Sequence, residues 1–369
     1  MKNNNLVLID TVAGFFIIPL CFFIRFFKKI IYIFLKNNNN KILIIKFLGA
    51  GNFLAGKNEI NDHKMDIVTV KSNFQTLNFF GIGNKVFYIN DLNFFSLTFS
   101  CITCCFKLFF SNYRQIINLE TESKFAKFLT SLSTAKKISG LSNTNKSLVD
   151  YWLYDNYLVT PLMESRDSLI SQLIQFHPKI NLNINSAIDF QKQKFLAKNK
   201  LDNLAKIIIA PTCSDTDNLR RLKDEDWVKI IEILLVKDNI GSIDIIFPNA
   251  LDSQFVFFNS LKVKSMKINI KVTSYVEFIE HISNTDLLIS IDSQAVHIAQ
   301  QLKKKTVAIY GPTNPFGDNI SETTYPIYNS LACSPCTHKY LRTPCNAKAP
   351  CMNFTDGAFD IFKNINLPI

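Results

Sequence analysis

Three features that would assign this chain to a common class of protein are missing from its sequence. No uninterrupted apolar run reaches the roughly 20 residues of a membrane-spanning helix. The longest run, Thr11 to Ile24, also contains Pro19. The start of the chain carries no small-residue cleavage site, so it does not resemble a signal peptide. The nine cysteines show no regular pairing and lie mostly in apolar segments, which favours a reducing compartment over a secreted disulfide scaffold.

Acidic residues are scarce as well. The 369 residues include 30 Asp and Glu against 41 Lys and Arg, which gives a formal net charge of +11. Such a balance predicts an anionic partner. Nucleic acid and an anionic membrane surface are both candidates, and the apolar N-terminus favours the membrane. The length of the chain suits two domains of ordinary size.

The N-terminal stretch, residues 6–35, is apolar apart from a few embedded charges that include the cations Arg25, Lys28 and Lys29. Its length and charges favour a segment that lies in or dips into the membrane interface, with the cations at the lipid headgroups. A true membrane span and a buried helical hairpin that covers the first domain are the alternatives. With the asparagine linker that follows, residues 1–40 form the predicted membrane-associated segment.

The clearest local pattern is a strand, a helix and a second strand. The apolar run Leu287 to Ile291 enters a polar turn at Asp292 and Ser293, and an amphipathic segment leads to a second apolar run, Val307 to Tyr310. Continuously apolar strands predict a parallel sheet that is covered on both faces. Asp292 and Ser293 then lie at a helix start, where free N–H groups and the positive end of the dipole attract phosphate. We expect a diphosphate to bind there.

The stretches Ser290-Ile-Asp-Ser-Gln-Ala-Val-His-Ile-Ala and Val307-Ala-Ile-Tyr-Gly-Pro-Thr-Asn-Pro resemble the donor-binding motif of glycosyltransferase family 9, the heptosyltransferase family. The resemblance implies the GT-B fold, an α/β architecture of two Rossmann-like doubly wound domains facing a cleft. It also implies a donor-binding role for His297. The family has Gly where this chain has Gln294, and a side chain there narrows the approach of a pyrophosphate to the backbone. The Gln amide could itself donate a hydrogen bond.

The strand Lys41 to Phe47 and the Gly-rich loop ending at Asn52 resemble the opening of the family's acceptor-side domain, so we assign residues 41–185 to a Rossmann-like acceptor domain. The family's catalytic Asp is replaced by Asn52, and an amide cannot usefully take up a proton at neutral pH. Glu120 lies just beyond another expected strand, residues 115–119, at the edge where ligands of open α/β sheets bind. Glu120 is therefore our candidate base; the alternative is a carboxylate that stabilises a helix dipole.

The remaining segments follow the alternation of a doubly wound sheet. We expect further strands at residues 66–70, 85–88, 206–210, 244–247 and 267–271. Residues 151–178 look helical. Cys101, Cys104 and Cys105 have helical spacing in an apolar segment, so we interpret them as one core face rather than a metal site.

Residues 186–369 are assigned to a nucleotide-sugar-binding Rossmann-like domain. The loop after its first strand resembles the family's loop of small hydroxyl residues, which implies that Thr212 and Ser214 contact the donor. Arg220 matches the family's phosphate-binding Lys, and its guanidinium offers a fixed fork to two phosphate oxygens. A surface basic pair is the alternative. Asp252 lies where relatives place an acid near the nucleoside.

Cys333, Cys336, Cys345 and Cys351 follow one another with two, eight and five intervening residues. Many family members carry a Cys-rich stretch here, and four thiolates could hold a structural Zn²⁺. Buried reduced thiols or an oxidised pair are the alternatives. The few cations nearby argue against a basic, zinc-bearing nucleic-acid protein.

The resemblance implies an inverting glycosyltransferase that moves a heptose or related sugar from an ADP-heptose-like donor to a lipopolysaccharide-core or other cell-envelope glycolipid. We expect no cofactor for catalysis and no nucleic-acid partner. The anionic membrane partner implies the cytoplasmic face of the bacterial inner membrane, with peripheral or N-terminal anchoring. The alternative is a GT-B-like protein that binds nucleotide or glycolipid without transfer, which Asn52 and Gln294 favour.

Overall fold

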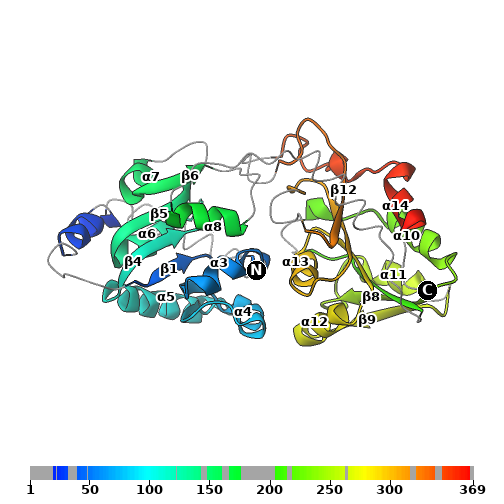
Figure 1. The fold of residues 1–369 in the computed structure, drawn as a ribbon, viewed down its shortest axis with the longest axis horizontal. Helices are drawn as coiled ribbons and strands as arrows, with labels where there is room; N and C mark the ends of the chain where they lie inside the picture. Colours follow the sequence, from blue (N-terminus) through cyan, green and yellow to red (C-terminus); the bar gives the residue numbers. More distant parts are fainter. Residues whose placement is uncertain are drawn as a thin grey trace. The chain divides into compact units, whose positions relative to one another are not determined.

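The structure is a computed structural model, and it divides the chain into two compact units, Met1–Lys179 and Ile180–Ile369. It describes residues 20–21, 23–31, 40–47, 49–121, 123–142, 148–159, 166–175, 204–213, 218–261, 265–315, 321–336 and 343–365. The predicted domain boundary between residues 185 and 186 lies outside these ranges. Each unit is built around its own parallel sheet (Figure 1).

The first unit holds a six-stranded sheet in the order β3-β2-β1-β4-β5-β6, and all its strands pair in parallel. Its strands are β1 (Ile42–Ile45), β2 (Asp66–Val70), β3 (Val86–Ile89), β4 (Asn112–Asn118), β5 (Thr134–Ser142) and β6 (Asn156–Val159). The central β1 is a run of Ile and Leu that is buried on both faces. Burying each such side chain contributes about 1.5–3 kcal/mol, which is why an apolar run settles at the centre of the sheet.

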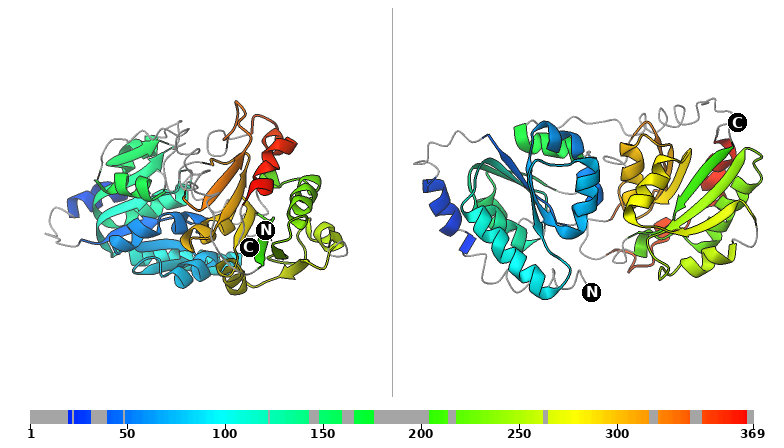
Figure 2. Two further views of the ribbon diagram at one scale, coloured as in Figure 1. Left: turned by 45° about the vertical axis from the view of Figure 1, so that its right-hand side comes forward. Right: turned by 90° about the horizontal axis from the view of Figure 1, so that it is seen from below.

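Helices cover both faces of this sheet (Figure 2). One face carries α5 (Phe94–Phe109), α6 (Lys124–Leu132) and α7 (Leu148–Leu153), which share one hydrophobic core with the strands. The other face carries α2 (Ala50–Ala55), α3 (Lys57–Asp62), η1 (Lys71–Asn73), α4 (Phe74–Phe80) and α8 (Arg166–Gln175). Cys101 and Cys104 are buried in the α5 core and Cys105 packs beside them, as predicted. Burial raises the pKa of Cys104 to about 12, so this thiol stays protonated.

The helix formed by residues 20–21 and 23–31, here called the N-terminal helix, packs against this unit with Arg25 and Lys28 turned inward. Arg25 donates to the carbonyl of Ala135 at 3.2 Å and pairs with Asp155 at 2.9 Å. Lys28 donates to the carbonyl of Phe109 at 2.5 Å. The expectation that Arg25 and Lys28 lie at lipid headgroups is therefore wrong, because protein oxygens satisfy them inside the fold. Among the described residues, no helix is long and apolar enough to cross a bilayer.

The second unit repeats the architecture with a six-stranded sheet in the order β12-β11-β10-β7-β8-β9. Its strands are β7 (Ala205–Ala210), β8 (Ile240–Phe247), β9 (Ile268–Val272), β10 (Leu287–Ile291), β11 (Thr306–Tyr310) and β12 (Thr324–Tyr328). Its helical segments are η2 (Asn218–Arg220), α10 (Asp224–Leu235), α11 (Phe255–Leu261), α12 (Tyr275–Ser283), α13 (Gln294–Gln301), η5 (Pro350–Met352), η6 (Asp356–Phe359) and α14 (Asp360–Asn364). Trp227 of α10 lies fully buried at the centre of this core.

Both sheets follow the Rossmann strand order, with the order reversing between β1 and β4 in one unit and between β7 and β10 in the other. The predicted α/β fold with two doubly wound parallel sheets is confirmed. The expected strands are all present within a few residues of their predicted bounds. The helical prediction for residues 151–178 is wrong at Asn156–Val159, which pairs with β5 as an edge strand.

Candidate functional site

In the second unit, the strand order reverses between β7 and β10, and the segments that leave these strands diverge at their carboxyl ends. Ligands of doubly wound sheets bind in the crevice that this divergence leaves. Thr212 follows β7 and is half-buried, and Asp292 and Ser293 follow β10. The predicted donor residues therefore converge on this edge, except for Ser214, which lies outside the described residues.

Arg220 reaches this edge from η2. Its Nη1 donates to the backbone carbonyl of Asp292 at 2.8 Å and lies 3.4 Å from the Asp292 carboxylate. Both side chains are largely buried, with 17 % and 11 % of their surface exposed. Arg220 and Asp292 are 72 residues apart in the sequence. We predicted both as donor-binding residues, and in the structure they are in contact. The result is a buried guanidinium beside a helix start, a combination suited to phosphate.

Ser293 caps helix α13. Its Oγ accepts a hydrogen bond from the Ala295 N–H at 3.3 Å and lies 3.1 Å from the Ser290 hydroxyl. The Ser290 hydroxyl in turn donates to the carbonyl of Ala210 at 3.0 Å, which ties β10 to β7 at the point of reversal. This link fixes the direction in which the helix start points its N–H groups.

Gln294, which occupies the position of the family glycine, is held by a neighbouring helix. Its Nε2 donates to the Tyr275 hydroxyl of α12 at 2.6 Å. Tyr275 did not emerge from the sequence reasoning, since only the fold brings the start of α12 to the start of α13. The contact orients the Gln294 amide, so the side chain keeps one position at the edge of the helix start.

Two buried polar atoms near these strand ends have no hydrogen-bond partner among the residues that the structure describes. They are His297 Nδ1, on α13, and Thr313 Oγ1, just beyond β11. A buried polar group without a partner costs about 1–3 kcal/mol. Such groups are therefore expected where a ligand completes the hydrogen bonding, which is consistent with the donor-binding prediction for His297.

Asp252 is engaged by the protein itself. Its carboxylate forms a two-pronged ion pair with Arg221 at 2.9 and 2.8 Å, and Oδ1 also accepts from the Gln254 N–H at 3.0 Å. Burial opposes ionisation of this carboxyl, but the hydrogen bonds of Arg221 and Gln254 outweigh burial and lower the pKa of Asp252. Arg221 thus holds the loop after β8 in place, whereas the Arg220 guanidinium lies at the start of helix α13.

In the first unit, the corresponding reversal lies between β1 and β4, and Glu120 follows β4 there. Its Oε1 accepts from the Phe47 N–H at 2.8 Å and pairs with Lys46 Nζ at 3.0 Å. Its own N–H donates to Asn118 Oδ1 at 2.9 Å. Sequence reasoning found Glu120 but missed Lys46, although Lys46 is the first charged residue after the apolar run of β1.

Asn52 lies in α2, directly after the loop that leaves β1. Its N–H donates to the Gly49 carbonyl at 2.9 Å, and Gly49 has a φ of 88°. A Cβ added at Gly49 would lie only 2.5 Å from Asn52 Nδ2. The Asn52 amide therefore lies over the backbone of Gly49, and only glycine fits beneath it.

The predicted zinc site is not formed. Cys333, Cys336, Cys345 and Cys351 are free thiols, and no group of three or more His, Cys, Asp or Glu within the described ranges is placed to hold a metal ion. Burial and the neighbouring Cys336 raise the pKa of Cys351 to about 11. Zinc binds thiolates, whereas the Cys351 thiol packs protonated beneath Gly311 at the end of β11.

The model of glycosyltransferase family 9, the heptosyltransferases, matches residues 107–346, which is more than half of the chain. None of the curated proteins compared with the chain matches it.

Several solved structures share its fold. The E. coli heptosyltransferase WaaC with ADP-2-deoxy-2-fluoro heptose is 16 % identical, with a TM-score of 0.56 over 87 % of this chain and 98 % of that one. The E. coli ADP-heptose lps heptosyltransferase II is 13 % identical, with a TM-score of 0.57 over 88 % and 97 %. A family 9 glycosyl transferase from Veillonella parvula is 12 % identical, with a TM-score of 0.58 over 86 % and 94 %.

The family match spans Glu120, Arg220 and the start of α13, and the solved heptosyltransferase structures share the fold. The chain belongs to glycosyltransferase family 9, the heptosyltransferase family, and is a glycosyltransferase.

Proposed function

We propose that this protein transfers a heptose or related sugar from a nucleoside-diphosphate donor to a hydroxyl of a cell-envelope glycolipid, with inversion at the anomeric carbon. The observation that carries the proposal is the convergence of Arg220, Asp292 and the α13 start at the strand-order reversal of the second unit. The nucleotide is proposed to be ADP, because related heptosyltransferases are described with ADP or an ADP-heptose analogue.

On the donor side, the bond between the anomeric carbon and the diphosphate oxygen breaks, and negative charge develops on the diphosphate. Arg220 supplies a fixed positive charge there, and the N–H groups at the α13 start supply hydrogen bonds. Because these groups stabilise the leaving group, the proposed reaction uses no metal ion.

On the acceptor side, the hydroxyl oxygen attacks the anomeric carbon and its proton passes to Glu120. Lys46 and the Phe47 N–H hold this carboxylate in place at the end of β1, and a carboxylate is a group that can accept a proton. Asn52 lacks that capacity and instead shapes the loop after β1. We assign the protein to the cytoplasmic face of the bacterial inner membrane, held there through residues 1–40.

Arg220→Ala tests the donor half of the proposal. Removing a buried charged partner of a phosphate costs about 2–5 kcal/mol, so donor affinity should fall by at least about thirtyfold. Isothermal titration with ADP and with ADP-heptose measures the loss. Lys229→Ala, which removes an exposed cation of α10, serves as the matched control and should bind as the parent chain does. Equal affinity in Arg220→Ala and the parent chain would remove Arg220 from the site.

A further inference from the structure

Helix α5 carries a row of large apolar side chains that the first unit leaves in solvent. Phe95, Phe99, Ile102 and Phe106 of α5, and Phe110 directly after it, recur at intervals of three or four residues, and between 50 % and 84 % of each is exposed. The opposite side of the helix, including Leu97 and Leu108, is buried in the core. A helix that is apolar on both sides needs a second apolar partner.

The N-terminal helix extends this surface. Its Lys28 lies over the Phe109 ring at 3.8 Å, so the helix is joined to the end of α5. Because Arg25 and Lys28 point inward, Phe23, Phe26 and Phe27 point outward, each more than half exposed. A helix that buries Arg25 and Lys28 and exposes three phenylalanines is the reverse of a helix built to face water.

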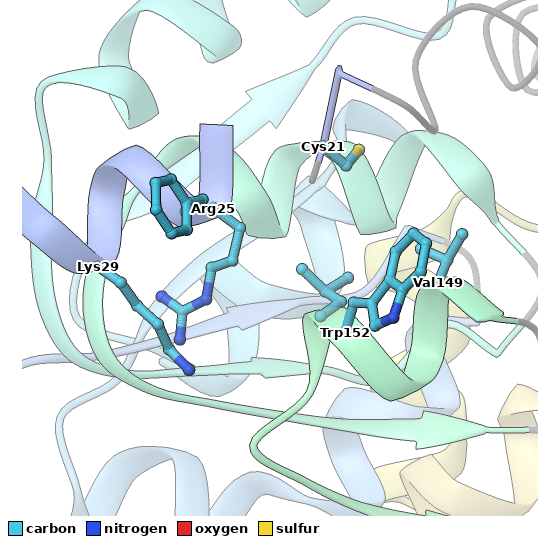
Figure 3. A pocket seen from close by; sticks show the side chains of 7 residues that line it. Cys21, Arg25, Lys29, Val149 and Trp152 are labelled. Carbon is cyan, nitrogen blue, oxygen red and sulfur yellow. The ribbon is translucent and has the colours of Figure 1, made fainter. Parts of the chain in front are cut away.

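Helix α7 adds an aromatic border on the same layer of helices. Its exposed Trp152 faces a pocket of about 200 Å³ that Arg25 and Lys29 of the N-terminal helix also line (Figure 3). Trp and Tyr side chains favour the boundary between hydrocarbon and headgroups, and Tyr151 beside Trp152 is exposed too.

The charge around this surface has one sign. The sequence has no acidic residue between Asp91 and Glu120, a stretch that contains all of α5 and the exposed Lys107. The acids of the neighbouring elements are already paired, Asp155 with Arg25 and Lys29 and Asp150 with Lys127. An approaching anionic surface therefore meets Lys107 and aromatic rings, and α5 presents no carboxylate that would repel it.

We propose that α5, the N-terminal helix and α7 form one docking surface for a bilayer with anionic headgroups, and that α5 lies along the membrane plane. The α5 helix starts after β3, at the edge of the sheet where Glu120 lies, and ends before β4, at the opposite edge. Leu92 and Phe95 at its start thus bring the bilayer to the catalytic edge of the sheet. This inference rests on the proposed function and extends it, because it identifies the edge of the first sheet at which a lipid-linked acceptor arrives.

The triple variant Phe95→Gln/Phe99→Gln/Phe106→Gln tests the surface by flotation of the full chain with vesicles of phosphatidylglycerol and phosphatidylethanolamine. Partitioning should fall by at least about tenfold, because three apolar side chains no longer enter the bilayer. The matched control is Leu251→Gln/Val256→Gln/Met266→Gln, which changes exposed apolar residues of the second unit and should leave flotation unchanged. Thermal unfolding checks that both variants fold. Parental flotation of the α5 variant would overturn the proposal.

Quenching by brominated lipid locates the contact directly. The chain has two tryptophans, and Trp227 is fully buried in the second unit. In a Trp152→Phe background, Phe99→Trp should be quenched by brominated vesicles, whereas Val256→Trp should not. Absence of quenching in a chain that floats would show that other residues alone bind the membrane.

A second copy of the chain is the competing occupant. If the parent chain is a dimer without vesicles and the α5 variant is a monomer in sedimentation, the surface is a subunit interface and the bilayer proposal fails. Flotation and quenching require neither donor nor turnover, so their outcome stands apart from that of the proposed sugar transfer.

Discussion

Glu120 and Arg220 are held in place by different kinds of contact, and this difference separates their expected roles. The Glu120 carboxylate accepts hydrogen bonds from the Lys46 ammonium and from the Phe47 N–H just after β1, and these contacts orient it. Arg220 is oriented by a backbone carbonyl and leaves a guanidinium, whose charge is fixed, at a helix start. One residue can exchange a proton and the other can only stabilise charge.

Glu120→Gln should lower turnover by about a hundredfold to ten-thousandfold, the usual loss when a general base is removed. Donor affinity should stay unchanged, since Glu120 belongs to the other unit. Initial rates with a confirmed acceptor, together with donor titration, measure both effects. Glu59→Gln, which alters the pair with His63 on α3, is the control and should keep full activity.

Adding Asn52→Asp to Glu120→Gln then asks whether the loop after β1 can still act on the acceptor. Recovery of rate would place residue 52 beside the hydroxyl. Full turnover in Glu120→Gln alone would show that another carboxylate is the base.

Sequence reasoning predicted most of these residues, because strand ends and the family motif mark them directly. It missed Lys46 and Tyr275, whose partners Glu120 and Gln294 lie far away in the chain. It also offered a zinc site as one interpretation of the four C-terminal cysteines. Spacing cannot show that Cys351 packs beneath Gly311, where burial favours the neutral thiol.

Among the elements, the apolar strands were predictable and the polar ones were not. β5 contains Thr134, Ser139 and Ser142 as buried residues, and Ser139 accepts a hydrogen bond from Gln115 of β4 at 2.7 Å. Side-chain hydrogen bonds between strands replace the apolar pattern there, so no periodicity marks the strand. The adjoining β6 owes its conformation to pairing with β5, a tertiary effect that local propensity does not contain.

Helix α5 depends on its first turn. Asn93 accepts from the Ser96 N–H at 2.9 Å, and the Ser96 hydroxyl accepts from the Asn93 N–H at 3.3 Å, which completes a capping box. Asn93→Ala should therefore lower the free energy of unfolding by about 0.5–2 kcal/mol. Urea denaturation measures the change. Asn93→Asp keeps an acceptor at the cap and should stay close to the parent chain; equal losses in both variants would contradict a capping role.

At the scale of the whole molecule, each unit has its own sheet and its own core, and the stability of the second unit depends on buried charge. The Asp252–Arg221 pair joins the loop after β8 to the segment before α10, with 4 % and 14 % of the side chains exposed. The folded state lowers the pKa of Asp252 below its ordinary value of about 3.9. The pair therefore stabilises the fold above that value, and the contribution disappears as pH falls through the folded pKa.

Asp252→Asn should destabilise the second unit by about 3 kcal/mol at neutral pH, because Arg221 then remains buried without its counter-charge. The difference in Tm between this variant and the parent chain should shrink as the pH is lowered from about 5 towards 2. Calorimetry across this range measures it. Asp360→Asn, which breaks an exposed pair with Lys363, should leave the stability close to that of the parent chain, because surface ion pairs contribute little. A pH-independent difference for Asp252→Asn would refute the linkage.

The strand order of the molecule has an evolutionary consequence. Each six-stranded order is complete within one unit, so each ligand edge is generated by a separate set of hydrogen-bonded strands. Substitutions that change the binding properties of the edge at Glu120 do not alter the register of β7 and β10. Likewise, substitutions at the edge that holds Arg220 do not alter the register of β1 and β4. With the roles proposed for these two edges, selection can alter the acceptor specificity while donor binding is inherited unchanged, and recombination between related genes can exchange one specificity without the other.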